Sequence, residues 1–171
     1  GDNSALCVRQ GNTVLEIQSF ASMDLMQLCG VIKNRYDEAT VLERPQEILV
    51  DVIGIGAGVV DRLREQNLPV RGVNVSESPS SKKNYLNLRA ELWFAIKDWL
   101  AQRDCRLPND DELVAELAAP LYKYTSTGKI KIESKDEMRK RGIKSPDKAD
   151  ALALTMASSA ASFSGSESVF G

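Results

Sequence analysis

Apolar and polar residues alternate along two short segments near the start of the chain. Segments 5–10 and 13–20 each repeat with a period of two, and Gly11-Asn12 separates them. Alternation of this kind is typical of half-buried β-strands, and a glycine-containing pair between two such runs favours a tight turn. The pattern therefore predicts an antiparallel β-hairpin.

A helix and a strand-helix-strand unit are predicted after this hairpin. Segment 47–53 is an almost continuous apolar run, as in a buried strand, and segment 70–75 is a second strand. The helix predicted between them, over 59–66, makes the two strands parallel, because a crossover connection joins parallel neighbours. Ahead of this unit, apolar residues recur at helical spacing at Leu25, Leu28, Cys29, Ile32 and Tyr36.

The second half of the chain is predicted to be mainly helical. Segment 84–103 has the longest helical pattern, and 110–118 is a shorter acidic helix. Segments 121–124 and 129–133 flank Ser126-Thr127-Gly128 and predict a second hairpin. Ser145 and Pro146 mark the start of a last helix with an apolar face of Leu152, Leu154 and Met156.

The composition indicates one compact α/β domain. With 171 residues and 43% hydrophobic content the chain can bury one core, which we place in residues 1–160, with a flexible serine-containing tail over 161–171. No apolar run reaches about 18 residues and no secretory leader is present, so we expect a cytoplasmic protein. The absence of histidine argues against a zinc site, and Cys7, Cys29 and Cys105 are expected to be reduced core residues.

Basic residues cluster locally although the formal net charge is −2. Candidate DNA-binding residues are Lys82, Lys83, Arg139, Lys140, Arg141 and Lys144, with Lys148 in the same basic segment. These cations could neutralise phosphates. They could equally form a solvated helix face with ion pairs such as Asp136 with Lys140 and Glu137 with Arg141. Both interpretations remain open at this stage.

Two aspartates far apart in the sequence are the candidate chemical groups. Asp51 ends the buried strand, just before a turn containing Gly54 and Gly56, and Asp150 lies in the first turn of the last helix. Open α/β sheets bind ligands at the carboxyl ends of their strands, and Mg²⁺ and Mn²⁺ prefer oxygen ligands. The pair therefore predicts a divalent-metal site. Asp147, one turn before Asp150, is either a further ligand or an acid favoured by the helix N-terminus.

The motifs VDVIGIGAGVVDRL and SPDKADALALT together resemble the C-terminal nuclease domain of the tailed-phage terminase large subunit. The similarity extends from GDNSALCVRQGN through LRAELWFAIKDWL to the last helix, and SPDKADALALT is the more specific motif. The resemblance implies a ribonuclease-H-like fold, with a mixed sheet flanked by helices. It also implies a metal-dependent endonuclease that cuts concatemeric viral double-stranded DNA during genome packaging in the host cytoplasm.

The same resemblance assigns roles to individual residues. Asp51 would bridge two Mg²⁺ or Mn²⁺ ions, and Asp150 would supply a ligand from the last helix. Two such ions about 4 Å apart can activate a water and stabilise the leaving oxygen of a phosphodiester. The second hairpin would lie near the DNA. The implied partners are double-stranded DNA, the portal, the small terminase subunit and an upstream ATPase domain, with no membrane.

The sequence departs from the family pattern at its start. In these nucleases the first metal-binding aspartate lies on a strand that precedes a Gly-Asp-(Asp/Asn)-Ser turn, and this sequence begins at that turn, Gly1-Asp2-Asn3-Ser4. The first strand and its carboxylate are therefore expected to be absent. Asp2 is an imperfect substitute ligand, so the metal site of this piece is expected to be incomplete unless another carboxylate completes it, and whether the piece cuts DNA stays open at this stage.

Two other function classes are compatible with the motifs. A glycine-rich turn after a strand and before a helix also occurs in Rossmann nucleotide-binding domains, with Glu77 at the distance of a ribose ligand. The Gly-x-Gly-x-Gly spacing and the preceding hairpin argue against that fold. The second alternative is a non-catalytic fragment that docks DNA or a packaging partner. No Gly-x-x-x-x-Gly-Lys-(Ser/Thr) motif is present, so the chain is not itself the packaging ATPase.

Overall fold

The computed structural model describes residues 3–158, so Asp2 and the predicted tail lie outside the described residues. Strands β1 (Ser4–Gln10) and β2 (Thr13–Phe20) pair antiparallel, which confirms the first predicted hairpin. Gly11 adopts a φ of +56° in the connecting turn, a conformation that is easy for glycine. The register shifts between Val8 and Arg9, as in a β-bulge.

The predicted strand-helix-strand unit is also present. It consists of β3 (Ile48–Asp51), α2 (Gly56–Glu65) and β4 (Val70–Val73), with β3 and β4 parallel. Helix α1 (Leu25–Glu38) precedes this unit and packs against α2. β3 ends earlier than predicted and α2 starts earlier, because the chain turns immediately after Asp51.

Four helices and a hairpin make up the second half of the described chain. They are α3 (Leu88–Ala101), α4 (Asp111–Ala118), β5 (Tyr122–Tyr124), β6 (Ile130–Ile132), α5 (Lys135–Lys140) and α6 (Asp147–Thr155). The second predicted hairpin is therefore confirmed. No helix among the described residues is long and apolar enough to cross a membrane.

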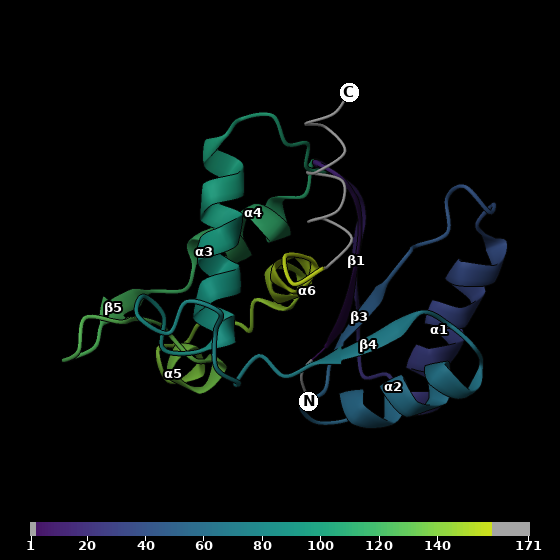
Figure 1. Cartoon of the computed structure of the whole chain (residues 1–171), viewed down its shortest axis with the longest axis horizontal. Helices are drawn as coiled ribbons and strands as arrows, with labels where there is room; N and C mark the ends of the chain where they lie inside the picture. Colours follow the sequence, from purple (N-terminus) through teal and green to yellow (C-terminus); the bar gives the residue numbers. More distant parts are fainter. Residues whose placement is uncertain (1–2, 159–171) are drawn as a thin grey trace.

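The strands form three separate two-stranded sheets in residues 3–158, in the orders β1-β2, β3-β4 and β5-β6. The sequence predicts a single mixed sheet flanked by helices. The structure confirms a mixed α/β fold, but its strands are divided among separate small sheets. Helix α6 packs against both β1 and β3, and it lies between α3 and β1 in Figure 1. This helix therefore connects the first two sheets.

Two apolar clusters stabilise the structure. The first joins β2, α3, α4 and α6, and its buried members include Val14, Ile96, Leu113 and Leu152. The second lies among α1, α2 and the segment before β4, and includes Cys29, Val59 and Leu63. All three cysteines are free thiols. Cys29 is buried and the other two are half-buried, and burial raises the pKa of Cys7 to about 12.

Candidate functional site

Asp51 is fixed at the end of β3 by the turn that follows it. Its Oδ1 accepts a hydrogen bond of 3.0 Å from the Ile53 backbone N–H. Gly54 has a φ of +72°, and a Cβ on Gly56 would lie 1.6 Å from the Asp51 carbonyl oxygen. Only glycine at position 56 therefore allows α2 to begin this close behind the strand, and the turn presents the Asp51 carboxylate at the strand end.

Asp150 approaches the same region from the first turn of α6. Its Oδ1 accepts hydrogen bonds from the Trp93 indole N–H at 2.9 Å and from Arg89 at 3.3 Å, both on α3. The Arg89 guanidinium also donates to the Glu133 carbonyl at 2.7 Å and lies 5.6 Å from the Trp93 ring centroid. One carboxylate oxygen of Asp150 is thus held by two donors from α3.

The other oxygen of Asp150 is in a different environment. Oδ2 is buried and accepts no hydrogen bond from the described residues, although the Lys135 ammonium lies 3.4 Å away. Lys135, the first residue of α5, is also 3.5 Å from Asp147 Oδ1, and that oxygen accepts a 2.8 Å hydrogen bond from the Ser145 hydroxyl. Asp147 and Asp150 therefore share one cation on the side of α6 that faces α5.

Electrostatics link Asp51 to this group. Burial raises the pKa of Asp51, and the nearby negative charge of Asp150 raises it further. The Ile53 N–H and the positive charges of Lys135 and Arg89 act in the opposite direction. The structure therefore brings Asp51 and Asp150 within electrostatic reach of each other, as the sequence predicts, and places two basic side chains beside them.

This arrangement fits a divalent cation in part. A buried carboxylate oxygen without a hydrogen-bond donor is the type of ligand that Mg²⁺ and Mn²⁺ prefer, and Asp51 offers a second carboxylate. No group of three or more acidic or cysteine side chains that could hold a metal occurs within residues 3–158. The predicted ligand Asp2 lies outside that range. Asp147 lies beside Asp150, so a ligand role for it stays a prediction.

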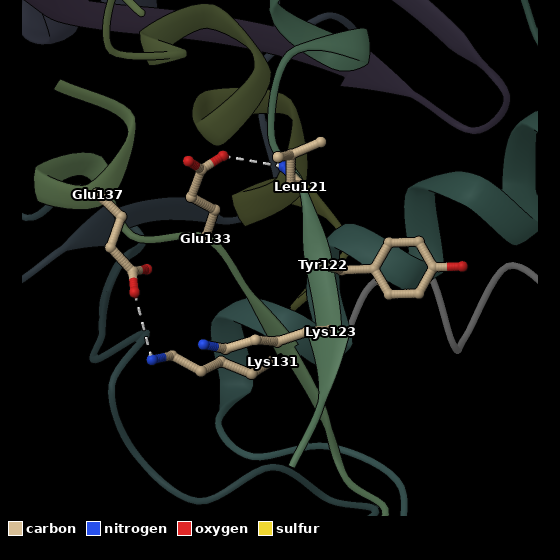
Figure 2. Close-up of a pocket in the computed structure, with 6 residues that line it drawn as sticks. All are labelled: Leu121, Tyr122, Lys123, Lys131, Glu133 and Glu137. Carbon is tan, nitrogen blue, oxygen red and sulfur yellow. Dashed lines mark hydrogen bonds and ion pairs between the residues drawn. The ribbon is translucent and has the colours of Figure 1, made fainter. Parts of the chain in front are cut away.

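A shallow pocket of about 300 Å³ opens on the β5-β6 hairpin, which leads into α5. Lys123 and Lys131 are directly paired across the two strands and extend side by side, whereas Tyr122 points to the opposite face (Figure 2). Lys131 lies 3.6 Å from Glu137, and the Glu133 carboxylate accepts from the Leu121 N–H at 3.0 Å. Like charges directly opposite each other destabilise a hairpin, so pairing Lys123 with Lys131 does not contribute to the stability of this one.

No protein-family model matches the sequence, and no curated protein matches it significantly. Solved structures do match. The nuclease domain of the large terminase subunit of bacterial virus Sf6, in a mutant form with manganese and β-thujaplicinol, has a TM-score of 0.78 over 92% of this chain and 83% of that chain, at 22% identity. This chain has the fold of a phage terminase nuclease domain. The prediction from the sequence motifs is thereby confirmed at the level of fold.

Other terminase nuclease domains give the same result. The Sf6 domain in another structure matches with a TM-score of 0.74 and 23% identity, over 92% of this chain and 83% of that one. The large terminase nuclease of thermophilic phage G20c, with bound magnesium, matches with a TM-score of 0.62 and 14% identity, over 91% and 80% of the two chains. These similarities favour the terminase nuclease fold over the Rossmann alternative.

The predicted DNA-binding residues fall into two groups on this terminase-like fold. Lys82, Lys83, Lys140 and Lys144 are exposed, which leaves them available to phosphates. Arg139 is exposed and pairs with Asp136 at 2.9 Å. Arg141 instead binds both carboxylate oxygens of Glu133 at 2.9 Å, together with the Ala119 carbonyl at 3.0 Å. The expected pair of Glu137 with Arg141 is therefore replaced by Glu133 with Arg141, a contact that fixes the hairpin to α5.

Sequence reasoning missed three side chains of the site. No motif in the sequence predicts a role in the site for Lys135, Arg89 or Trp93. Arg89 and Trp93 are four residues apart on α3, so they share one helix face, and that spacing is a signal of joint action. Their common target, Asp150, is more than fifty positions away and could not be identified from spacing alone.

Proposed function

We propose that this chain is a Mg²⁺- or Mn²⁺-dependent endonuclease domain that cuts double-stranded viral DNA during genome packaging. The observation that carries the proposal is that Asp51 and Asp150 lie near each other in a chain with the fold of terminase nuclease domains. In addition, the Asp150 Oδ2 atom is buried and has no hydrogen-bond donor among the described residues. Related domains are described with bound manganese and magnesium, which supports the choice of ion.

In this proposal the fold is of the ribonuclease-H type, and Asp51 and Asp150 hold the metal as its carboxylate ligands, Asp51 from β3 and Asp150 from α6. When bound, two divalent ions would activate the attacking water and stabilise the leaving oxygen of the phosphodiester. Trp93 and Arg89 hold Oδ1 of Asp150, which would leave Oδ2 to bind the metal. Asp147 and Asp2 are further candidate ligands.

The DNA would contact basic residues around this site. Lys123 and Lys131 on the hairpin, with Lys82, Lys83, Lys140 and Lys144, are exposed or half-buried cations that can neutralise backbone phosphates. Contacts of this kind position DNA without reading its sequence, so we expect little base specificity. We further propose that the domain acts in the host cytoplasm beside the portal, a small terminase subunit and an ATPase.

The test is nicking of supercoiled plasmid in Mn²⁺ by the chain, by its Asp150→Asn variant and in the presence of EDTA. We expect nicking that both the substitution and the chelator remove. Activity that persists in either control would contradict the proposed site. A folded chain that binds duplex DNA without cutting it in Mn²⁺ would mean either that the metal site of this chain lacks a ligand or that the domain only docks DNA.

A further inference from the structure

Among the described residues, Lys148 is the only charged residue that is buried, and it lies two positions before Asp150. Its residue exposure is only 9%. The ammonium donates to Asp110 Oδ2 at 2.8 Å and to Glu112 Oε2 at 3.4 Å, so both partners lie at the start of α4. This hydrogen bond raises the pKa of Lys148 and lowers that of Asp110. A buried ammonium costs solvation free energy unless it is paired this well.

Helix α4 also supplies the missing cap of α6. The N-cap residue of α6, Pro146, makes no side-chain hydrogen bond to the helix. Instead, Glu116 of α4 accepts a 2.9 Å hydrogen bond from the Ala149 backbone N–H. The first turn of a helix leaves several N–H groups without intrahelical partners, so this contact from another element stabilises the turn that carries Asp150.

The contacts to α4 and to the site lie on different sides of α6. Residues two apart on a helix do not face each other, so Lys148 points toward α4 while Asp150 points toward Trp93 and Lys135. The first turn of α6 is therefore held from one side by Lys148 and Glu116, and from the other by the donors to Asp150. A loss on the α4 side would let the turn shift, and Asp150 with it.

We propose that Lys148 is a positioning residue, whose partly buried ion pair with Asp110 fixes the first turn of α6 and so determines the position of the Asp150 carboxylate. The effect of Lys148 on metal binding rests on the proposed nuclease function. The effect of Lys148 on the position of Asp150 does not, because the hydrogen bond from Trp93 to Asp150 reports that position without any metal. The same ion pair gives α4 a role in the site although it contributes no metal ligand.

The Trp93 indole N–H resonance reports the position of Asp150 directly. We expect Lys148→Met to move it in a ¹H–¹⁵N correlation spectrum toward its position in Asp150→Ala, where the 2.9 Å hydrogen bond is absent. Trp99 donates to Asn12 Oδ1 at 3.1 Å, a contact that involves neither α4 nor α6, so its indole resonance serves as the internal reference. Lys33→Met, at an ion pair with Asp37 on α1, is the matched control and should leave both resonances in place.

Asp110→Asn provides a second variant in case Lys148→Met fails to fold. Asparagine caps a helix about as well as aspartate, so the hydrogen bond that Asp110 accepts from Leu113 N–H can be kept while the negative charge opposite Lys148 is removed. We expect a smaller movement of the Trp93 resonance in the same direction. An unmoved Trp93 resonance in a folded Lys148→Met or Asp110→Asn chain overturns the proposal.

Metal titration separates this inference from the proposed function. If the chain binds Mn²⁺, Lys148→Met should weaken binding in calorimetry by about 10- to 100-fold, the usual effect of removing a residue that orients a ligand. Lys148→Arg, which keeps the charge, should recover most of the affinity. A wild-type chain that binds no Mn²⁺ would count against the proposed function, while the Trp93 resonance would still decide whether Lys148 positions Asp150.

Discussion

At the residue scale, the half-buried carboxylate of Asp51 destabilises the folded chain when no metal is bound. Burial raises the pKa of Asp51 in the folded state, so ionising it opposes folding at neutral pH. Asp51→Asn should therefore raise the melting temperature in EDTA at pH 7, while abolishing nicking. The rise should be small, because even 1 kcal/mol corresponds to only about 2–4 °C in a domain of this size.

The pH dependence of that gain checks its cause. Below its folded-state pKa, Asp51 is protonated and no longer opposes folding, so the melting temperatures of wild type and Asp51→Asn should converge as the pH falls toward 4. Asn can still accept the hydrogen bond from Ile53, which keeps the turn intact. A variant less stable than wild type at pH 7 would instead indicate a structural aspartate.

Lys135 leads to a second prediction at this scale. Its ammonium lies 3.4 Å from Asp150 Oδ2, the atom proposed to bind metal, so cation and lysine compete for one oxygen. Lys135→Ala should tighten Mn²⁺ binding by less than about fivefold, because a partly exposed ion pair contributes at most about 1 kcal/mol. Calorimetry against Lys33→Ala measures the change, and weaker binding in Lys135→Ala would mean that this lysine supports the ligands.

At the scale of elements, the sequence predicts most helices and strands because their signals are local. Gly11-Asn12 and the period of two determine the first hairpin, and the apolar run with its glycines determines β3 and α2. The start of α3 was placed too early because residues 84–86 bond to Ile130 of β6, a contact that spacing cannot show. The motifs predict Asp51 and Asp150, whereas Lys135 enters the site through its ion pairs with Asp147 and Asp150 of α6, which spacing cannot show.

The hairpin formed by β5 and β6 carries its own prediction. If Lys123 and Lys131 each neutralise one phosphate, replacing both by Gln should reduce the salt dependence of duplex DNA binding. The slope of log K against log salt should fall by about 0.9 for each lost contact. Fluorescence anisotropy in the Asp150→Asn background measures this without cleavage, with Lys33→Gln as the control. An unchanged slope would show that the lysine pair is only a solvated surface.

At the scale of the whole molecule, the candidate site lies where the two apolar clusters meet. Asp51 ends a strand that packs on the α1–α2 side, whereas Asp150 belongs to α6 and the α3–α4 side. Polar contacts hold the two sides together, including the hydrogen bonds from Arg71 to the Ala157 carbonyl at 2.6 Å and from Ser158 to Glu47 at 2.9 Å. A metal bound by both aspartates would therefore act as a further cross-link between the clusters.

This arrangement predicts that Mn²⁺ stabilises the fold as a whole, and not only the site. A ligand that binds only the folded state at 100 times its dissociation constant adds about 2.7 kcal/mol, or about 5–10 °C in a domain of this size. Differential scanning calorimetry should show that rise in the wild-type chain and its loss in Asp51→Asn and Asp150→Asn. Asp61→Asn, at a carboxylate 77% exposed on α2, should keep the full rise. Equal rises in melting temperature in all four proteins would mean that Mn²⁺ binds away from Asp51 and Asp150. Only binding between these two residues requires one carboxylate from each side of the molecule.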